Sequence, residues 1–186
     1  MPDLCIINSD GMRTTALILF LISLLGCQNP QERKEIMNED RTIQETVTRV
    51  FVNTDQQNWN GVEAQFATEV ILDYESMTGN PANKLNPTEI TSTWKTVLPG
   101  FESTHHQIGN FLISANNDSA RVFCYGTATH YLEDENGSVW TVVGSYDFDL
   151  KKAGDNWKIT SMRFNYKYQE GNGALIEKAI ENVKLN

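Results

Sequence analysis

Four long β-type segments in the second half of the chain constrain its fold most strongly. They cover about residues 104–114, 119–132, 139–151 and 157–168. Short turn signals separate them, and residues 135–137 contain the Asn-Gly pair that most strongly indicates a hairpin. Consecutive strands joined by short turns pair as antiparallel neighbours, so the pattern predicts a four-stranded meander.

Helical patterns precede this predicted sheet. Apolar residues at helical spacing predict an amphipathic helix over about residues 38–54. Asn58 can cap a second short helix that carries Val62 and Phe66 on one face. Residues 86–89 (NPTE) form a helix start signal, with a capping Asn, a Pro at the first helical position and a Glu at the third.

The remaining elements complete an α+β pattern. Residues 70–74 (VILDY) predict a short strand, and a last helix is predicted over about residues 174–184. Because the strand meander follows the helices, we expect a cone-shaped, curved antiparallel sheet with the N-terminal helices covering its concave face. Such an arrangement encloses a pocket between the sheet and the helices.

The N-terminal region has the layout of a secretory signal. Residues 16–25 (ALILFLISLL) follow Arg13, and Gly26-Cys27 closes this apolar run. The run is too short for a membrane-spanning helix, which takes about 20 residues. The sequence at residues 24–27 (LLGC) resembles the lipobox of bacterial lipoproteins, which implies that Cys27 is lipidated and becomes the first mature residue.

This signal divides the chain into three parts. We expect a signal peptide over residues 1–26, with the true start at Met12, then a polar tether over residues 27–37 and one α+β domain over residues 38–186. The expected localisation is that of an exported lipoprotein, anchored in the outer membrane or on the cell surface of a bacterium. The membrane is contacted through the lipid anchor alone.

Charge and motif content exclude several classes of function. The 24 Asp and Glu residues outnumber the 15 Lys and Arg residues, and a net charge of -9 repels nucleic acid. The three cysteines are too few and too scattered for a disulfide scaffold or a zinc cluster. The chain contains no HExxH motif, no CxxC motif and no glycine-rich phosphate loop. We therefore expect no cofactor, no metal and no nucleic-acid partner.

The three histidines all lie on predicted strands. His105 and His106 are adjacent, so alternation sends their side chains to opposite faces and only one can enter the pocket. Alternation alone leaves open which of them does. It places Ile108, Asn110 and Leu112 on the face of His106.

The second long strand offers a wall for the pocket. One alternating set is small and apolar and has His130 at its end: Val122, Cys124, Gly126, Ala128 and His130. Two further polar residues end elements nearby, since Asp55 follows the first helix and Tyr74 ends the short strand. A histidine backed by a carboxylate can act as a general base near neutral pH, and a tyrosine hydroxyl can polarise a carbonyl.

The order of elements and several motifs resemble the SnoaL-like branch of the nuclear transport factor two-like superfamily. The motifs are residues 54–59 (TDQQNW), 70–74 (VILDY), 104–110 (THHQIGN) and 154–159 (GDNWKI). The nearest functional parallel is scytalone dehydratase. This resemblance implies that His106 is the general base, Asp55 its orienting carboxylate, Tyr74 a donor to the substrate carbonyl and His130 a second polar contact.

The chain also departs from that enzyme's pattern. Thr54 stands where the enzyme has a second carbonyl-binding tyrosine, and Gly144 and Tyr146 stand where it has polar Ser and Asn residues. The first hypothesis is therefore a dehydratase-like lyase or isomerase, without cofactor, that acts on a small apolar carbonyl compound. The alternatives are a noncatalytic lipoprotein that binds a small ligand in the same pocket and an interaction lipoprotein. The resemblance also implies a homodimer formed through the exposed sheet face.

Overall fold

A computed structural model describes residues 30–185 of the chain. The predicted signal peptide, Cys27 and the start of the predicted tether lie outside these residues. The chain divides into two units, residues 1–38 and residues 39–186, and the fold below is that of the second unit. Among the described residues, no helix combines the length and the hydropathy needed to cross a bilayer.

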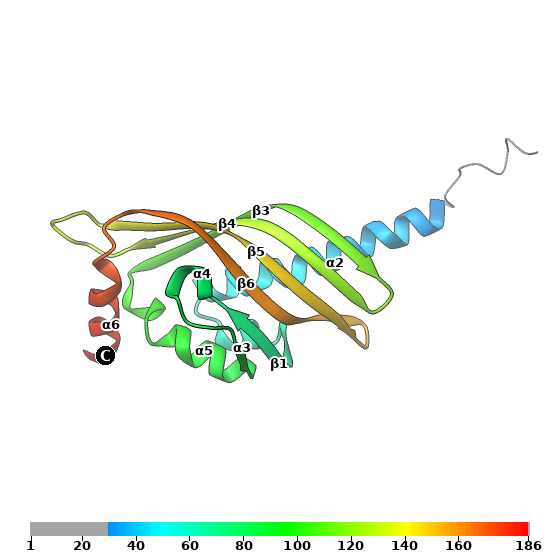
Figure 1. Cartoon of the computed structure of the whole chain (residues 1–186), viewed down its shortest axis with the longest axis horizontal. Coiled ribbons are helices and arrows are strands. Elements are labelled where there is room, and N and C mark those ends of the chain that lie inside the picture. Colours follow the sequence, from blue (N-terminus) through cyan, green and yellow to red (C-terminus); the bar gives the residue numbers. More distant parts are fainter. Residues whose placement is uncertain (1–29, 186) are drawn as a thin grey trace, which may run out of the picture. The chain divides into compact units, whose positions relative to one another are not determined.

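Six strands form one curved sheet with the order β2-β1-β6-β5-β4-β3 (Figure 1). The strands are β1 (Phe66–Asp73), β2 (Asn83–Leu85), β3 (Ser103–Asn116), β4 (Ser119–Tyr131), β5 (Val139–Ala153) and β6 (Asn156–Gly171). The antiparallel meander from β3 to β6 confirms the prediction. The sequence pattern did not predict the short β2, nor the parallel pairing of β1 with β6.

Helices precede, interrupt and follow the strands. They are α2 (Pro30–Asp55), α3 (Trp59–Glu63), α4 (Glu75–Thr78), α5 (Pro87–Lys95) and α6 (Leu175–Leu185), with a 3-10 turn at Leu98–Gly100. The predicted cap of α5 is present, because the Asn86 side chain accepts from the Glu89 backbone N–H at 3.0 Å and the Glu89 carboxylate accepts from the Asn86 backbone N–H at 2.8 Å. Helix α2 begins at Pro30, earlier than predicted, and α4 was not predicted.

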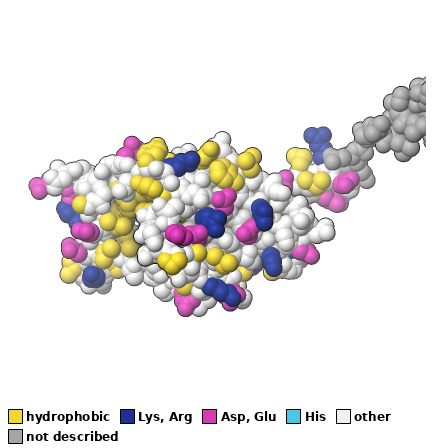
Figure 2. All heavy atoms as spheres, in the orientation of Figure 1, with side chains coloured by type: hydrophobic (Ala, Val, Ile, Leu, Met, Phe, Trp, Pro, Cys, Tyr) yellow, Lys and Arg dark blue, Asp and Glu magenta, His cyan; other side chains and the backbone are white. Residues whose placement is uncertain are grey.

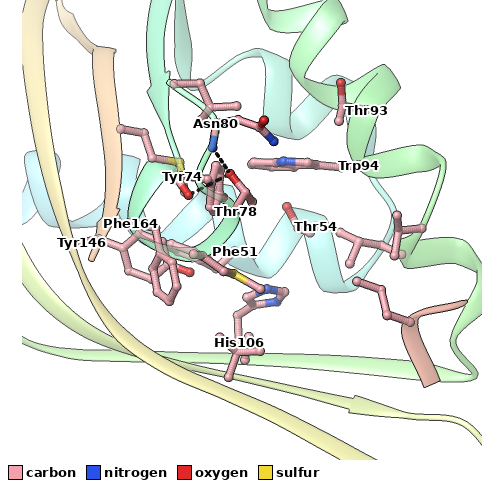
Figure 3. A pocket seen from close by; sticks show the side chains of 18 of the residues that line it. Phe51, Thr54, Tyr74, Thr78, Asn80, Thr93, Trp94, His106, Tyr146 and Phe164 are labelled. Carbon is pink, nitrogen blue, oxygen red and sulfur yellow. Dashed lines mark hydrogen bonds between the residues drawn. The ribbon is translucent and has the colours of Figure 1, made fainter. Parts of the chain in front are cut away.

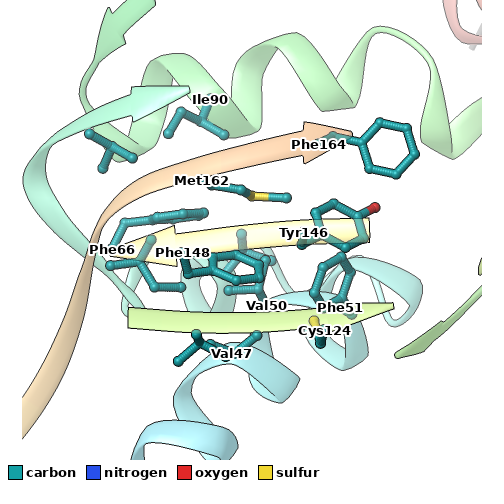
Figure 4. Packing of buried hydrophobic residues seen from close by; sticks show 14 of the residues in the cluster. Val47, Val50, Phe51, Phe66, Ile90, Cys124, Tyr146, Phe148, Met162 and Phe164 are labelled. Atoms are coloured by element: carbon teal, nitrogen blue, oxygen red, sulfur yellow. The ribbon is translucent and has the colours of Figure 1, made fainter. Parts of the chain in front are cut away.

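The core lies between the apolar stripe of α2 and the inner face of the sheet. Val47 and Val50 of α2 are fully buried, and Phe51 is 4% exposed. The Phe51 ring lies 4.9 Å from the Tyr146 ring and 6.3 Å from the Phe148 ring, both on β5 (Figure 4). The helix is therefore held on the sheet by burial of apolar surface, and its C-terminal end is fixed beside strands β3 to β5.

A β-bulge in β3 corrects one part of the predicted alternation. The β3–β4 register shifts between Gly109 and Leu112, where Asn110 has a φ of 57°. The bulge adds one residue to the strand and reverses the alternation beyond it. Asn110 and Leu112 are therefore exposed, although we predicted them on the face of His106, and Phe111 packs against the core instead.

The second short helix also differs from its prediction. Asn58 caps α3 by accepting a hydrogen bond from the Gly61 backbone N–H at 3.2 Å, and Val62 is fully buried as predicted. Phe66 was predicted on the same helix face, but it is the first residue of β1. Helix α3 ends at Glu63, so the helical spacing from Val62 to Phe66 crosses the boundary between α3 and β1.

Candidate functional site

A cavity of about 410 Å³ lies within the second unit, between the sheet and the helices that cover it. Its lining is mainly apolar and includes Phe51, Leu72, Trp94, Trp140, Met162, Phe164 and Ile176 (Figure 3). On the face seen in Figure 2, hydrophobic side chains gather between α6 and α4, and both helices contribute residues to the lining. A cavity of this size and character suits a small, largely apolar ligand.

His106 and Asp55 form a hydrogen-bonded pair at this cavity. The His106 side chain is 12% exposed and lines the cavity, whereas the neighbouring His105 side chain is on the exposed face of β3. This placement decides the question that alternation left open. His106 Nδ1 lies 2.7 Å from one oxygen of Asp55, and the His106 backbone N–H donates to the other oxygen at 2.8 Å.

The Asp55 carboxylate sets the orientation of the imidazole. Burial tends to raise the pKa of Asp55, but the hydrogen bonds and charge of His106 and the hydrogen bond from Thr104 outweigh it, so the pKa is lowered. Asp55 is therefore ionised at neutral pH and can only accept hydrogen bonds. Nδ1 of His106 must carry a proton toward it, which leaves Nε2 as the basic nitrogen.

His130 also lines the cavity, at the end of the predicted set on β4. Its Nδ1 lies 3.3 Å from the backbone oxygen of Trp140, an acceptor, so Nδ1 carries the proton and Nε2 is an acceptor. Burial and the nearby charge of His106 lower the pKa of His130 to about 4. His130 is thus neutral at pH 7, with its ring stacked on Trp140 at 4.7 Å and 6.0 Å from the His106 ring.

Tyr74 enters the cavity directly after β1. Burial raises the pKa of its hydroxyl well above the ordinary value, so the group stays protonated and can donate a hydrogen bond. Asp73, the adjacent residue, does not line the cavity. Its carboxylate accepts from the Glu75 backbone N–H at 3.0 Å and from Arg163 Nε at 2.7 Å, which orients the start of α4.

Two positions that depart from the enzyme's pattern also line the cavity. Thr54 donates its hydroxyl proton to the backbone oxygen of Val50 at 2.7 Å, so it offers no hydrogen-bond donor to a ligand. Tyr146 does line the cavity, although the sequence analysis did not include it among the site residues. The alternation Gly144, Tyr146, Phe148 and Leu150, all buried on β5, is the signal that could have placed it there.

The predicted site residues Asp55, Tyr74, His106 and His130 therefore come together around one cavity or, for Asp55, directly behind it. The arrangement offers one carboxylate-backed imidazole nitrogen, a second neutral imidazole and phenol donors inside an apolar space. Within residues 30–185, no group of three His, Cys, Asp or Glu side chains is arranged to hold a metal ion. Such a set can bind a small polar head on an apolar ligand and can move a proton on it.

A curved sheet with helices over one face and an apolar pocket between them defines a class of small-molecule pocket proteins. The chain belongs to the SnoaL-like domain family, whose model matches residues 35–163. This confirms the predicted family and the predicted cone-shaped α+β fold.

Solved structures with the same fold are distant in sequence. The Kfla4162 protein of Kribbella flavida is 21% identical with a TM-score of 0.68, over 80% of this chain and 99% of that chain. A candidate scytalone dehydratase of Novosphingobium aromaticivorans is 17% identical with a TM-score of 0.65, over 75% of this chain and 91% of that chain.

The hexachlorocyclohexane dehydrochlorinase LinA-type3 of Novosphingobium barchaimii is 12% identical with a TM-score of 0.64, over 76% of this chain and 94% of that chain. A comparison with curated proteins finds no match. At these identities the likeness shows the fold alone, although the names of two of these neighbours are those of a dehydratase and a dehydrochlorinase.

Proposed function

We propose that the chain is a cofactor-independent lyase or isomerase that removes a proton next to the carbonyl of a small, largely apolar compound. The observation that carries this proposal is the 2.7 Å contact between His106 Nδ1 and Asp55, which leaves Nε2 as a base at an apolar cavity. The elimination enzymes among the structural neighbours support the same class of reaction.

In the proposed reaction, His106 both takes up and returns the one proton that moves. Nε2 takes the proton from the carbon next to the carbonyl, and the electron pair of that C–H bond moves toward the carbonyl oxygen as an enolate forms. In a β-hydroxy ketone the carbonyl of the enolate then re-forms, a C=C bond forms between the α and β carbons, and the bond from the β carbon to the hydroxyl oxygen breaks. The imidazolium gives its proton to the departing hydroxide, so water leaves and the base is restored. In an isomerase the proton returns to another carbon.

His130 has a different role in this proposal. The lowered pKa makes the neutral His130 a weak base, so it can accept a hydrogen bond from the substrate hydroxyl through Nε2 without taking the proton held by His106. Tyr74, protonated and inside the cavity, donates to the carbonyl oxygen.

The test is exchange of the α-protons of small cyclic ketones in heavy water, followed by NMR. This assay reports proton removal without requiring the correct leaving group. We expect His106→Ala and Asp55→Asn each to lower the exchange rate by about 100-fold or more, and the double variant to be little slower than His106→Ala, because members of one catalytic unit are not additive.

His105→Ala is the matched control, since it removes an adjacent imidazole on the exposed face of β3. Unchanged exchange in the His106→Ala variant would refute the catalytic proposal. Ligand binding without any exchange in the unmodified protein would favour the alternative, a noncatalytic binding protein that uses the same cavity.

We also propose that the protein is exported and anchored to a bacterial membrane by a lipid on Cys27. The support is the sequence at residues 24–27, and the proposal is independent of the cavity. Expressed in bacteria with a labelled fatty acid, the full chain should incorporate label and Cys27→Ser should not. Equal labelling of the two chains would reject the anchor.

A further inference from the structure

Tyr146 is closely packed in the cavity wall. It is 5% exposed, and its ring lies 4.9 Å from the rings of Phe51 and Phe164 (Figure 4). A Cβ atom on Gly126 of the neighbouring strand would lie 2.3 Å from Tyr146 Cε2, so only glycine leaves room for the ring at this point. The phenol is thus fixed between two rings and the backbone of β4.

The hydroxyl groups of Tyr146 and Tyr74 have no hydrogen-bond partner among residues 30–185. No described side chain carries a fully buried N or O atom without a partner, so each of these hydroxyl oxygens reaches open space. The cavity is the space that both side chains line. Both rings also contact the Phe164 ring, at 5.9 Å for Tyr74 and 4.9 Å for Tyr146, so the two phenols belong to the same part of the wall.

Both hydroxyls are hydrogen-bond donors at neutral pH. Burial raises the pKa of Tyr146 well above the ordinary value, and the neighbouring Tyr74 raises it further. A second negative oxygen beside the first is disfavoured, so the pair stays protonated. Two inward donors without an acceptor gain most from a ligand oxygen that carries negative charge or develops it.

We propose that Tyr146 and Tyr74 together form a binding site for one oxygen of the ligand, either a phenolate or a carbonyl that becomes an enolate. Tyr146 then supplies the second donor that Thr54, bonded to Val50, does not. The Phe51 ring lies 5.6 Å from the His106 ring and 4.9 Å from the Tyr146 ring. A ligand lying over Phe51 can therefore place its oxygen at the phenols and its acidic C–H bond at His106.

Binding of a ligand oxygen by the two tyrosines does not depend on the proposed function. Only its effect on proton removal rests on the proposed function. The experiment is a titration of the full chain with 4-nitrophenol, whose phenolate absorbs at a longer wavelength than the phenol. Nitrobenzene is the matched ligand without the phenolic oxygen. We expect Tyr146→Phe to weaken phenolate binding by about 10-fold or more, because it removes a hydrogen bond to a charged oxygen.

Nitrobenzene should bind equally to the unmodified protein and to Tyr146→Phe. Tyr125→Phe is the matched protein control, since Tyr125 is 49% exposed on the opposite face of the sheet. Thermal melts show whether each variant is folded. Equal phenolate binding by the unmodified protein and Tyr146→Phe, or no binding by the unmodified protein, would overturn the oxygen site.

The α-proton exchange assay separates this proposal from the proposed function. If phenolate binding depends on Tyr146 but no ketone exchanges its protons, the oxygen site stands and the lyase or isomerase function falls. If exchange depends on His106 but phenolate binding is indifferent to Tyr146, the oxygen site falls and the function stands. If both results are positive, Tyr146→Phe should also slow exchange by about 10-fold.

Discussion

The neutral state of His130 should make the protein lose stability in mild acid. The reference pKa of a histidine is about 6.5, and the folded protein lowers the pKa of His130 to about 4. As the pH falls below 6.5, the unfolded chain takes up a proton that the folded chain does not. The stability is therefore complete above about pH 6.5 and is lost progressively until the folded histidine is protonated near pH 4.

The two pKa values give the size of this loss. They differ by about 2.5 units, which corresponds to about 3 kcal/mol of unfolding free energy once the pH lies below both values. Of this, about 2 kcal/mol is lost between about pH 7 and pH 5. That amount is a large fraction of the unfolding free energy of a typical domain, which is about 5–15 kcal/mol, so it is readily measured.

The assay is urea unfolding at both pH values, followed by tryptophan fluorescence. His130→Asn leaves an amide N–H near the Trp140 backbone oxygen but removes the titrating group. The variant should be less stable at pH 7 because it leaves a void, yet its loss between about pH 7 and pH 5 should be about 2 kcal/mol smaller than that of the unmodified protein.

His105→Asn is the control, because it makes the same substitution at the adjacent histidine, on the exposed face of β3. It should leave the pH dependence of the unfolding free energy unchanged. The reasoning is refuted if His130→Asn and the unmodified protein lose the same stability between the two pH values. That result would mean that His130 is solvated or charged in the folded protein, and its assignment as a neutral acceptor would be wrong.

Two further predictions concern the elements that shape the cavity. Gly126→Ala should lower the unfolding free energy by about 1–3 kcal/mol by displacing the Tyr146 ring, whereas Gly109→Ala, where no atom lies within 4 Å of the added carbon, should change it little. Equal urea midpoints for the two variants would contradict this packing. Asn86→Ala should cost about 1 kcal/mol by opening the capping box with Glu89, and an unchanged thermal midpoint would show that the cap is dispensable.

The sequence predicted the meander because its signals are local. Turn residues and two-residue alternation along β4 put Gly126, Ala128 and His130 on the inner face, and the structure agrees. The capping box at residues 86–89 was readable for the same reason, since all its partners lie within one turn. The parallel pairing of β1 with β6 was not predictable in this way, because it joins residues about 90 positions apart.

The candidate site was only partly predictable, because strand alternation is a local signal that does not show which face of a strand points inward. Alternation could not choose between His105 and His106, and the resemblance supplied the inward assignment that the structure bears out. Beyond Gly109 the alternation failed, because a bulge at Asn110 adds a residue that leaves no mark in the apolar pattern. Tyr146 was missed because it was compared with another enzyme's residue rather than with its own neighbours on β5.

Positions 54 and 146 show why a site is better judged by its geometry than by a motif, because the tyrosine missing at one is matched by a tyrosine at the other. Thr54 is buried near the C-terminal end of α2 and donates its hydroxyl proton to the Val50 backbone oxygen, so a threonine in place of a tyrosine there leaves no unpaired group. Tyr146 lies across the cavity on β5, and glycine at 126 admits its ring. A second phenol is therefore present in the wall although the motif lacks one. A comparison limited to aligned positions would count one donor, and the structure offers two.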